Sequence, residues 1–203
     1  MGTVWAPVRR TALSASAIVA LATPAVSPAA DPGYDCARAS GQVEELVCKD
    51  DALAALDRKL GEVYGIALEN YPQDERASLQ AQQRGWIRGR NDCWKADDVR
   101  DCVAREYSRR IVELQITAGQ LMAPKAVAFD CPDVDKTPLY AAFYTDADPA
   151  AVVLTLGDDQ VIAFIARSGS GSRYVTAGVE FWEHHGEATV TWFGVEFTCR
   201  LKR

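Results

Sequence analysis

The sequence predicts a two-domain protein of the α+β class, in which a small helical bundle is followed by a small antiparallel β-barrel or sandwich. Apolar residues recur at helical spacing between about residues 40 and 118. From residue 126 onward the period is two, and short β-prone runs alternate with turn residues. A chain of 203 residues is long enough for two compact domains, so the change of period indicates a boundary.

Helices are expected in the first domain at about residues 40–47, 51–70, 74–93 and 99–118. Ser40 with Glu44 forms an imperfect N-terminal cap for the first helix, and Asp50 or Asp51 caps the second. Pro72 ends the second helix, because proline cannot continue a helix. A domain of this size buries a small core and therefore benefits from disulfides.

The Gly/Ser-rich stretch Ser168–Arg173 is expected to be a surface turn, because serine and glycine are poor strand formers. It precedes a β-prone run at Val179–Trp182, which is followed by a second tight loop. Two such loops on neighbouring strands make a protruding surface on a rigid base, and surfaces of this kind often carry function. Short strands are expected at residues 126–130, 139–144, 151–156, 160–166, 179–182, 188–193 and 195–201.

Residues 1–30 are predicted to be a secretory signal peptide. Two arginines precede an apolar run from Thr11 to Leu21, and cleavage is expected near Ala29 or Ala30. The run is too short to span a bilayer comfortably, and Cys36 follows Gly-Tyr-Asp rather than a lipobox. We therefore expect no membrane anchor after cleavage and a location in the periplasm or outside the cell.

The cysteines indicate disulfides, because an even number in an exported chain is typical of a paired framework. The sequence alone allows fifteen pairings. Neither a metal site nor another cofactor is expected, since no CxxC motif occurs and the histidines are remote from the cysteines. Four cysteines lie in the helical half and two flank the strand-rich half, which favours Cys36–Cys48, Cys93–Cys102 and Cys131–Cys199.

An enzyme is not expected, because no catalytic constellation is recognised. None of Ser168, Ser170 and Ser172 lies in the Gly-x-Ser-x-Gly arrangement of a nucleophile elbow. The pair Asp158–Asp159 falls at a turn. With 28 acidic against 22 basic residues and no basic stripe, the sequence also argues against nucleic-acid binding.

Two motifs in the strand-rich domain carry a resemblance to a known family. The first is SGSRY at Ser170–Tyr174, and the second is FWEHHGEA at Phe181–Ala188. With their spacing and the flanking cysteines, they resemble the MliC/PliC family of bacterial periplasmic inhibitors of c-type lysozyme. The resemblance implies an eight-stranded barrel whose loops insert into the active-site cleft of lysozyme.

Residues 36–117 resemble the N-terminal domain of LprI-type lysozyme inhibitors. The change of period gives a helical domain at 31–119, a linker at 120–125 and a barrel domain at 126–203, and the two resemblances together cover nearly all of this mature chain. The matching residues are Cys36, Glu44 to Cys48, Leu53 to Leu60, Tyr64, Gln83, Trp86, Arg90, Asp92, Cys93, Cys102, Tyr107 and Arg110.

In the MliC/PliC family a serine of the first motif and a lysine of the second reach the two catalytic carboxylates of lysozyme. Ser170 matches the serine. The lysine is replaced by His184 or His185, depending on the alignment, and Arg173 is a further candidate cation. This departure predicts inhibition that strengthens as pH falls. The residues expected to bind c-type lysozyme are Ser170, Gly171, Arg173, Tyr174, His184 and His185.

Within these motifs, Tyr174 and Trp182 are expected to contribute mainly by packing the bases of the two loops. Because the family's lysine is absent, an envelope- or peptidoglycan-binding module without inhibitory activity is the alternative function.

Overall fold

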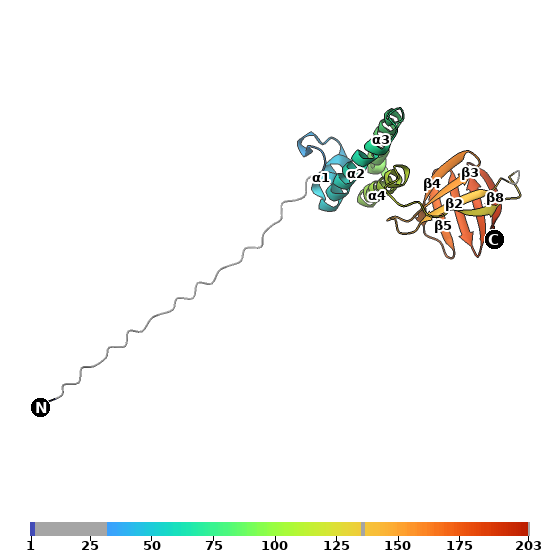
Figure 1. Ribbon diagram of the computed structural model, residues 1–203. Coiled ribbons are helices and arrows are strands. Elements are labelled where there is room, and N and C mark those ends of the chain that lie inside the picture. Colours follow the sequence, from blue (N-terminus) through green and yellow to red (C-terminus); the bar gives the residue numbers. More distant parts are fainter. Residues whose placement is uncertain (3–31, 135–136, 203) are drawn as a thin grey trace.

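A computed structural model describes residues 1–2, 32–134 and 137–202, and shows a helical domain followed by a β-barrel (Figure 1). The predicted signal peptide falls almost wholly within residues 3–31, outside the described residues. No helix in the described ranges is long and apolar enough to cross a membrane. The predicted α+β class, with helices first and strands second, is confirmed.

The helical domain contains four α-helices and two short 3₁₀ helices. The first α-helix begins at Gln42 with Gly41 as its N-cap, so the prediction that Ser40 caps it is wrong. Gly41 adopts a φ of 86°, which glycine tolerates at no steric cost, and Glu44 accepts a hydrogen bond from the Ser40 N–H instead. The α-helices are α1 (Gln42–Lys49), α2 (Asp51–Asn70), α3 (Arg76–Asn91) and α4 (Val99–Thr117), and the 3₁₀ helices are Cys36–Arg38 and Asp92–Lys95.

The second helix follows the prediction closely. The Asp50 carboxylate accepts hydrogen bonds from the N–H groups of Ala52 and Leu53, which satisfies two donors at the start of α2. The end of α3 differs, because its last predicted turn is a 3₁₀ helix that contains Cys93. Cys93 is bonded there to Cys102 in the first turn of α4.

The three predicted disulfides are all present: Cys36–Cys48, Cys93–Cys102 and Cys131–Cys199. The first two fasten short segments of the helical domain around a core that includes Val47, Leu53 and Val103. The third joins the residue that directly follows the first strand of the barrel to the last strand.

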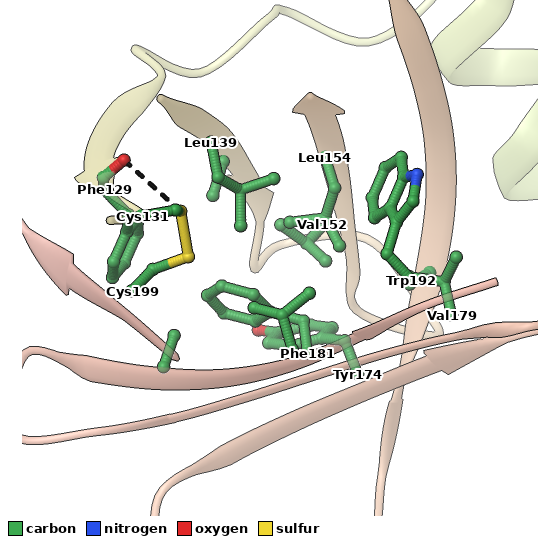
Figure 2. Packing of buried hydrophobic residues seen from close by; sticks show 14 of the residues in the cluster. Phe129, Cys131, Leu139, Val152, Leu154, Tyr174, Val179, Phe181, Trp192 and Cys199 are labelled. Carbon is green, nitrogen blue, oxygen red and sulfur yellow. Dashed lines mark hydrogen bonds between the residues drawn. A yellow bond between two sulfur atoms is a disulfide. The ribbon is translucent and has the colours of Figure 1, made fainter. Parts of the chain in front are cut away.

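Eight antiparallel strands pair in sequence order, and β8 returns to β1 to close the barrel. Closure leaves no unpaired sheet edge, which removes a route to aggregation. The barrel interior is filled by side chains such as Phe129, Leu154 and Phe181 (Figure 2). The strands are β1 (Val127–Asp130), β2 (Leu139–Tyr144), β3 (Ala151–Leu156), β4 (Asp159–Ala166), β5 (Ser172–Thr176), β6 (Val179–His184), β7 (Glu187–Trp192) and β8 (Val195–Leu201).

β5 corrects the expectation that Ser168–Arg173 is entirely a turn, because Ser172 and Arg173 are the first residues of a strand. β4 pairs with it on one side and β6 on the other, so its backbone groups are hydrogen-bonded despite a weak local preference for strand. The Gly/Ser-rich loop is therefore shorter than expected and spans residues 167–171.

The helical domain packs on the barrel through α4, the helix nearest to it in Figure 1. Val112 and Ile116 of α4 contact a cluster that includes Ala151 of β3 and Phe164 of β4. The Arg109 guanidinium carbon lies 5.4 Å from the centroid of the Phe164 ring. The linker enters β1 at the same end of the barrel as the loops after β4 and β6, since the strands alternate in direction.

Candidate functional site

The two motif loops lie at one end of the barrel and touch each other. The β4–β5 loop leads into Ser172, which pairs with Glu183 at the end of β6. The β6–β7 turn follows directly, with His184 paired to Glu187. β5 and β6 are adjacent strands, so the register alone brings the serine-rich loop against the histidine turn.

Trp182 holds the serine-rich loop in place. Its indole Nε1–H donates a hydrogen bond of 2.8 Å to the carbonyl oxygen of Ser170. Within the loop, the Ser168 hydroxyl donates to the Gly171 carbonyl oxygen at 2.9 Å. The Ser170 side chain is exposed, and no group among the described residues is hydrogen-bonded to its hydroxyl. This hydroxyl is therefore available to an external partner.

Gly171 is required where the two loops meet. Its φ is 67°, a left-handed conformation that side chains other than glycine rarely adopt. A Cβ atom at this position would lie 2.2 Å from the Glu183 carbonyl oxygen and 3.1 Å from the Cβ of His184. The close approach of the loops thus explains why glycine follows Ser170.

The histidines occupy a tight turn with exposed, stacked rings. His184 and His185 have ring centroids 4.0 Å apart and an interplanar angle of 19°. His185 and Gly186 both have positive φ, 55° and 83°, as a two-residue hairpin turn requires. The turn is supported by the Glu183 carboxylate, which accepts from the Gly186 N–H at 2.7 Å.

Arg173 is engaged within the barrel wall. Its guanidinium donates two hydrogen bonds to the Glu180 carboxylate, at 2.9 Å and 2.7 Å. This pairing lowers the pKa of Glu180 and raises that of Arg173, chiefly through the hydrogen bonds themselves. Any partner that uses Arg173 has to compete with Glu180.

Tyr174 points into the barrel and is 4% exposed, so its side chain packs the loop base as expected. Figure 2 shows it beside Phe181 in the interior, and its ring lies 5.7 Å from that of Phe143. Burial raises the pKa of the Tyr174 hydroxyl. Trp182, in β6, points outward from the barrel and is 42% exposed.

Arg200 is a cation near the site that the motifs do not reveal. It lies on β8 in register with Glu187, and its Nε is 3.2 Å from that carboxylate. The Arg200 side chain is 80% exposed, and an open groove of about 460 Å³ separates it from His185. Strand alternation predicts its outward direction, because Cys199 points inward, but only the register of the β7–β8 hairpin brings it beside the histidine turn.

No group of three or more side chains suited to holding a metal ion occurs in the described part of the chain. What the site offers is a free hydroxyl, two imidazoles and a guanidinium on a preorganised surface. These groups suit recognition of carboxylates by hydrogen bonds and positive charge.

Comparison with known proteins assigns each of the two domains to a family. The protein named Lipoprotein LprI from Mycobacterium tuberculosis is 39% identical to this chain over 198 residues, which is 97% of this chain and 98% of the relative. The protein of the same name from Mycobacterium bovis matches to the same extent. The chain belongs to the LprI family of lysozyme inhibitors.

The two domains of this LprI family member match separate family descriptions. Residues 35–114 match the family described as lysozyme inhibitor LprI. Residues 129–197 match the family described as membrane-bound lysozyme-inhibitor of c-type lysozyme, MliC. Both descriptions name inhibitors rather than enzymes, and the predicted resemblances are confirmed. No solved structure matches the chain.

Proposed function

We propose that this LprI family member inhibits c-type lysozyme by inserting the β4–β5 loop and the β6–β7 turn into the active-site cleft. The observation that carries the proposal is the contact between Trp182 and Ser170. It holds a serine with an unoccupied hydroxyl against a turn that bears two exposed histidines. Because the loops are held before binding, little conformational entropy is lost when they dock.

The chemistry of the target fits these groups. A lysozyme cleft holds a protonated carboxylic acid and an ionised carboxylate close together. A serine hydroxyl both donates and accepts hydrogen bonds, so Ser170 can satisfy both members of such a pair. A positive charge beside the serine then stabilises the ionised carboxylate.

Two sources supply that positive charge in our proposal. One is the pair His184 and His185, since imidazole side chains as a class gain a proton as the pH falls, and the other is the guanidinium of Arg200. The ion pair of Arg200 with Glu187 is largely exposed, and such pairs hold their partners weakly. Arg200 can therefore turn toward an incoming carboxylate, whereas Arg173 is held by two hydrogen bonds to Glu180.

The remaining motif residues act indirectly. Gly171 allows the loops to approach each other, and Tyr174 anchors the start of β5 in the barrel interior. We infer that the protein acts in the bacterial envelope, after export, where lysozyme attacks the cell wall.

The test is the lysis of a cell-wall suspension by a basic c-type lysozyme, titrated with residues 31–203. We expect lysis to stop at about one inhibitor per lysozyme, and Arg200→Gln to weaken inhibition at neutral pH. Lys202→Gln is the matched control, because Lys202 is a nearby exposed cation on the other side of Leu201. Undiminished lysis in the presence of excess inhibitor would reject the proposal.

A further inference from the structure

A cleft of about 510 Å³ opens in the helical domain, between α2, α3 and the segment that precedes α1. Its walls come from residues at helical spacing, so each helix turns one face toward it. α2 contributes Asp57, Leu60 and Tyr64, and α3 contributes Trp86, Ile87 and Arg90. The motif loops of the barrel contribute no residue to this cleft.

The floor of the cleft has one guanidinium for two carboxylates. Arg90 lies 3.8 Å from Glu44 and 3.8 Å from Asp57. The Arg90 side chain is 5% exposed, whereas those of Glu44 and Asp57 are 23% and 14% exposed. A group that enters the cleft therefore meets the carboxylates, because the arginine lies beneath them.

Internal contacts occupy Arg90 and hold the carboxylates in position. Arg90 donates to the Tyr107 hydroxyl and to the Asn91 side-chain oxygen. Asp57 accepts from the Gly33 N–H and from the Tyr107 hydroxyl, both at 2.7 Å. The geometry is fixed before any ligand arrives. Asp35 and Arg38 also line the cleft, so its charged side chains are three carboxylates and two guanidiniums, an excess of one negative charge.

The walls favour a ligand with an apolar stem. Leu60, Tyr64, Trp86 and Ile87 line the cleft with carbon surface. Gly61 leaves room between the helices, since an added Cβ there would have no neighbour within 4 Å. Lysine and arginine side chains have this form, with methylenes that pack on apolar surface and a charged end that reaches carboxylates.

We propose that this cleft binds an arginine or lysine side chain on the surface of a protein partner. The charged end pairs with Glu44 and Asp57, and the methylenes lie against Trp86 and Tyr64. An acidic ligand is disfavoured because it would meet like charge in a partly buried site. The proposal does not depend on the function assigned to the barrel loops.

The experiment titrates isotope-labelled protein, residues 31–203, with Nα-acetyl-arginine methylamide and Nα-acetyl-lysine methylamide, followed by NMR. We expect saturable shifts at the Trp86 indole N–H and the Gly61 amide with a basic probe. Nα-acetyl-glutamate methylamide should give none. The proposal fails if neither basic probe shifts these signals, or if the glutamate probe shifts them equally.

Paired variants locate the site. Glu44→Gln removes one charge and keeps an acceptor for the Ser40 N–H, and should weaken binding of the arginine probe at least fivefold. Glu45→Gln, on the exposed side of the same helix, should leave it unchanged. Equal weakening by both variants would overturn the assignment.

A second pair of variants distinguishes loss of binding from loss of folding. Gly61→Leu fills the cleft and favours the helix, so it should abolish the shifts in a folded protein. Gly89→Leu, at an open position of α3 that does not line the cleft, is its control and should bind normally. Normal binding by Gly61→Leu would contradict the proposal.

Discussion

The indole N–H of Trp182 donates a hydrogen bond of 2.8 Å to the carbonyl oxygen of Ser170, and this contact joins the two motifs of the barrel domain. Trp182 belongs to the second motif and Ser170 to the first. Their contact joins two loops into one surface, on which the serine-rich loop lies against the turn that bears the exposed histidines. The proposed inhibitory role of Ser170 thus depends on a residue that need not touch the partner itself.

Trp182→Phe tests this dependence, because it keeps the ring and removes the donor. Loss of one hydrogen bond of this kind costs roughly 0.5–1.5 kcal/mol, so we expect inhibition to weaken about two- to tenfold. The thermal midpoint should change little, because the variant keeps an aromatic ring at a position that is 42% exposed. Tyr140→Phe, on an exposed aromatic of β2, is the matched control and should inhibit as the wild type does. Equal inhibition by both variants would mean that the loop is held by other contacts.

Gly171→Ala is expected to reduce both stability and inhibition. Its φ is 67°, and the new Cβ would meet the Glu183 carbonyl oxygen at 2.2 Å. A strained residue of this kind costs roughly 1–3 kcal/mol, apart from the displacement of the loop. Gly169→Ala, two residues earlier with no neighbour within 4 Å, should be tolerated. Urea unfolding and inhibition titrations measure the two effects, and similar results for both variants would contradict this account.

The ion pair of Arg173 and Glu180 predicts a pH-dependent contribution to stability. The pKa of Glu180 is lowered in the folded protein, mainly by its hydrogen bonds with Arg173. A lowered carboxyl pKa stabilises the fold above the unfolded pKa, and that stability is lost as the pH falls through the folded pKa. Arg173→Gln should therefore be less stable than wild type at pH 7, with the difference disappearing in acid. A difference that persists unchanged below about pH 3, under the usual range of glutamate, would contradict this assignment.

Removal of Cys131–Cys199 by a double alanine substitution should destabilise the barrel strongly. The bond closes a loop with a sequence separation of 68 residues, and the loop-closure relation gives about 4 kcal/mol for that length. Urea unfolding monitored at β-sheet wavelengths tests this. A loss below about 1 kcal/mol would show that the reduced chain remains constrained when unfolded.

Inhibition is expected to strengthen as the pH falls from about 8 to 5, the range in which histidine side chains gain a proton. Binding to a carboxylate stabilises the protonated imidazole, so the complex takes up protons. The charged groups around the pair are Glu183, Glu187 and Arg200. A variant with His184→Gln and His185→Asn should lose the pH dependence. Wild-type affinity that is flat across this range would reject a histidine role.

Much of the fold follows from local sequence patterns. The strands Leu139–Tyr144, Ala151–Leu156 and Val195–Leu201 are predictable to the residue, because apolar runs there end at clear turn signals. The start of β5 is not predictable in this way. Ser172 and Arg173 have little strand preference of their own. Their state is decided by pairing, of Ser172 with β6 and of Arg173 with both β4 and β6.

The candidate site is predictable where it is contiguous in sequence and not where it depends on the register between neighbouring strands. The motifs indicate Ser170 and the histidines, but they do not show that Arg173 is held by Glu180 on the next strand. Arg200 reaches the site only because β8 pairs with β7 in a register that sets it opposite Glu187. The order of helices and strands does not predict the carboxylate-lined cleft, which forms only where residues of α1, α2 and α3 come together.

The inhibition constant of Ser170→Ala against a basic c-type lysozyme shows whether the serine-rich loop docks in the active-site cleft. Removing a hydroxyl that contacts buried carboxyl groups should weaken inhibition by roughly 1–3 kcal/mol, which is about five- to 150-fold. Ser172 is the first residue of β5, just after the loop, so the Ser172→Ala variant should inhibit as the wild type does. An unchanged inhibition constant for Ser170→Ala would contradict the proposed docking of the serine-rich loop.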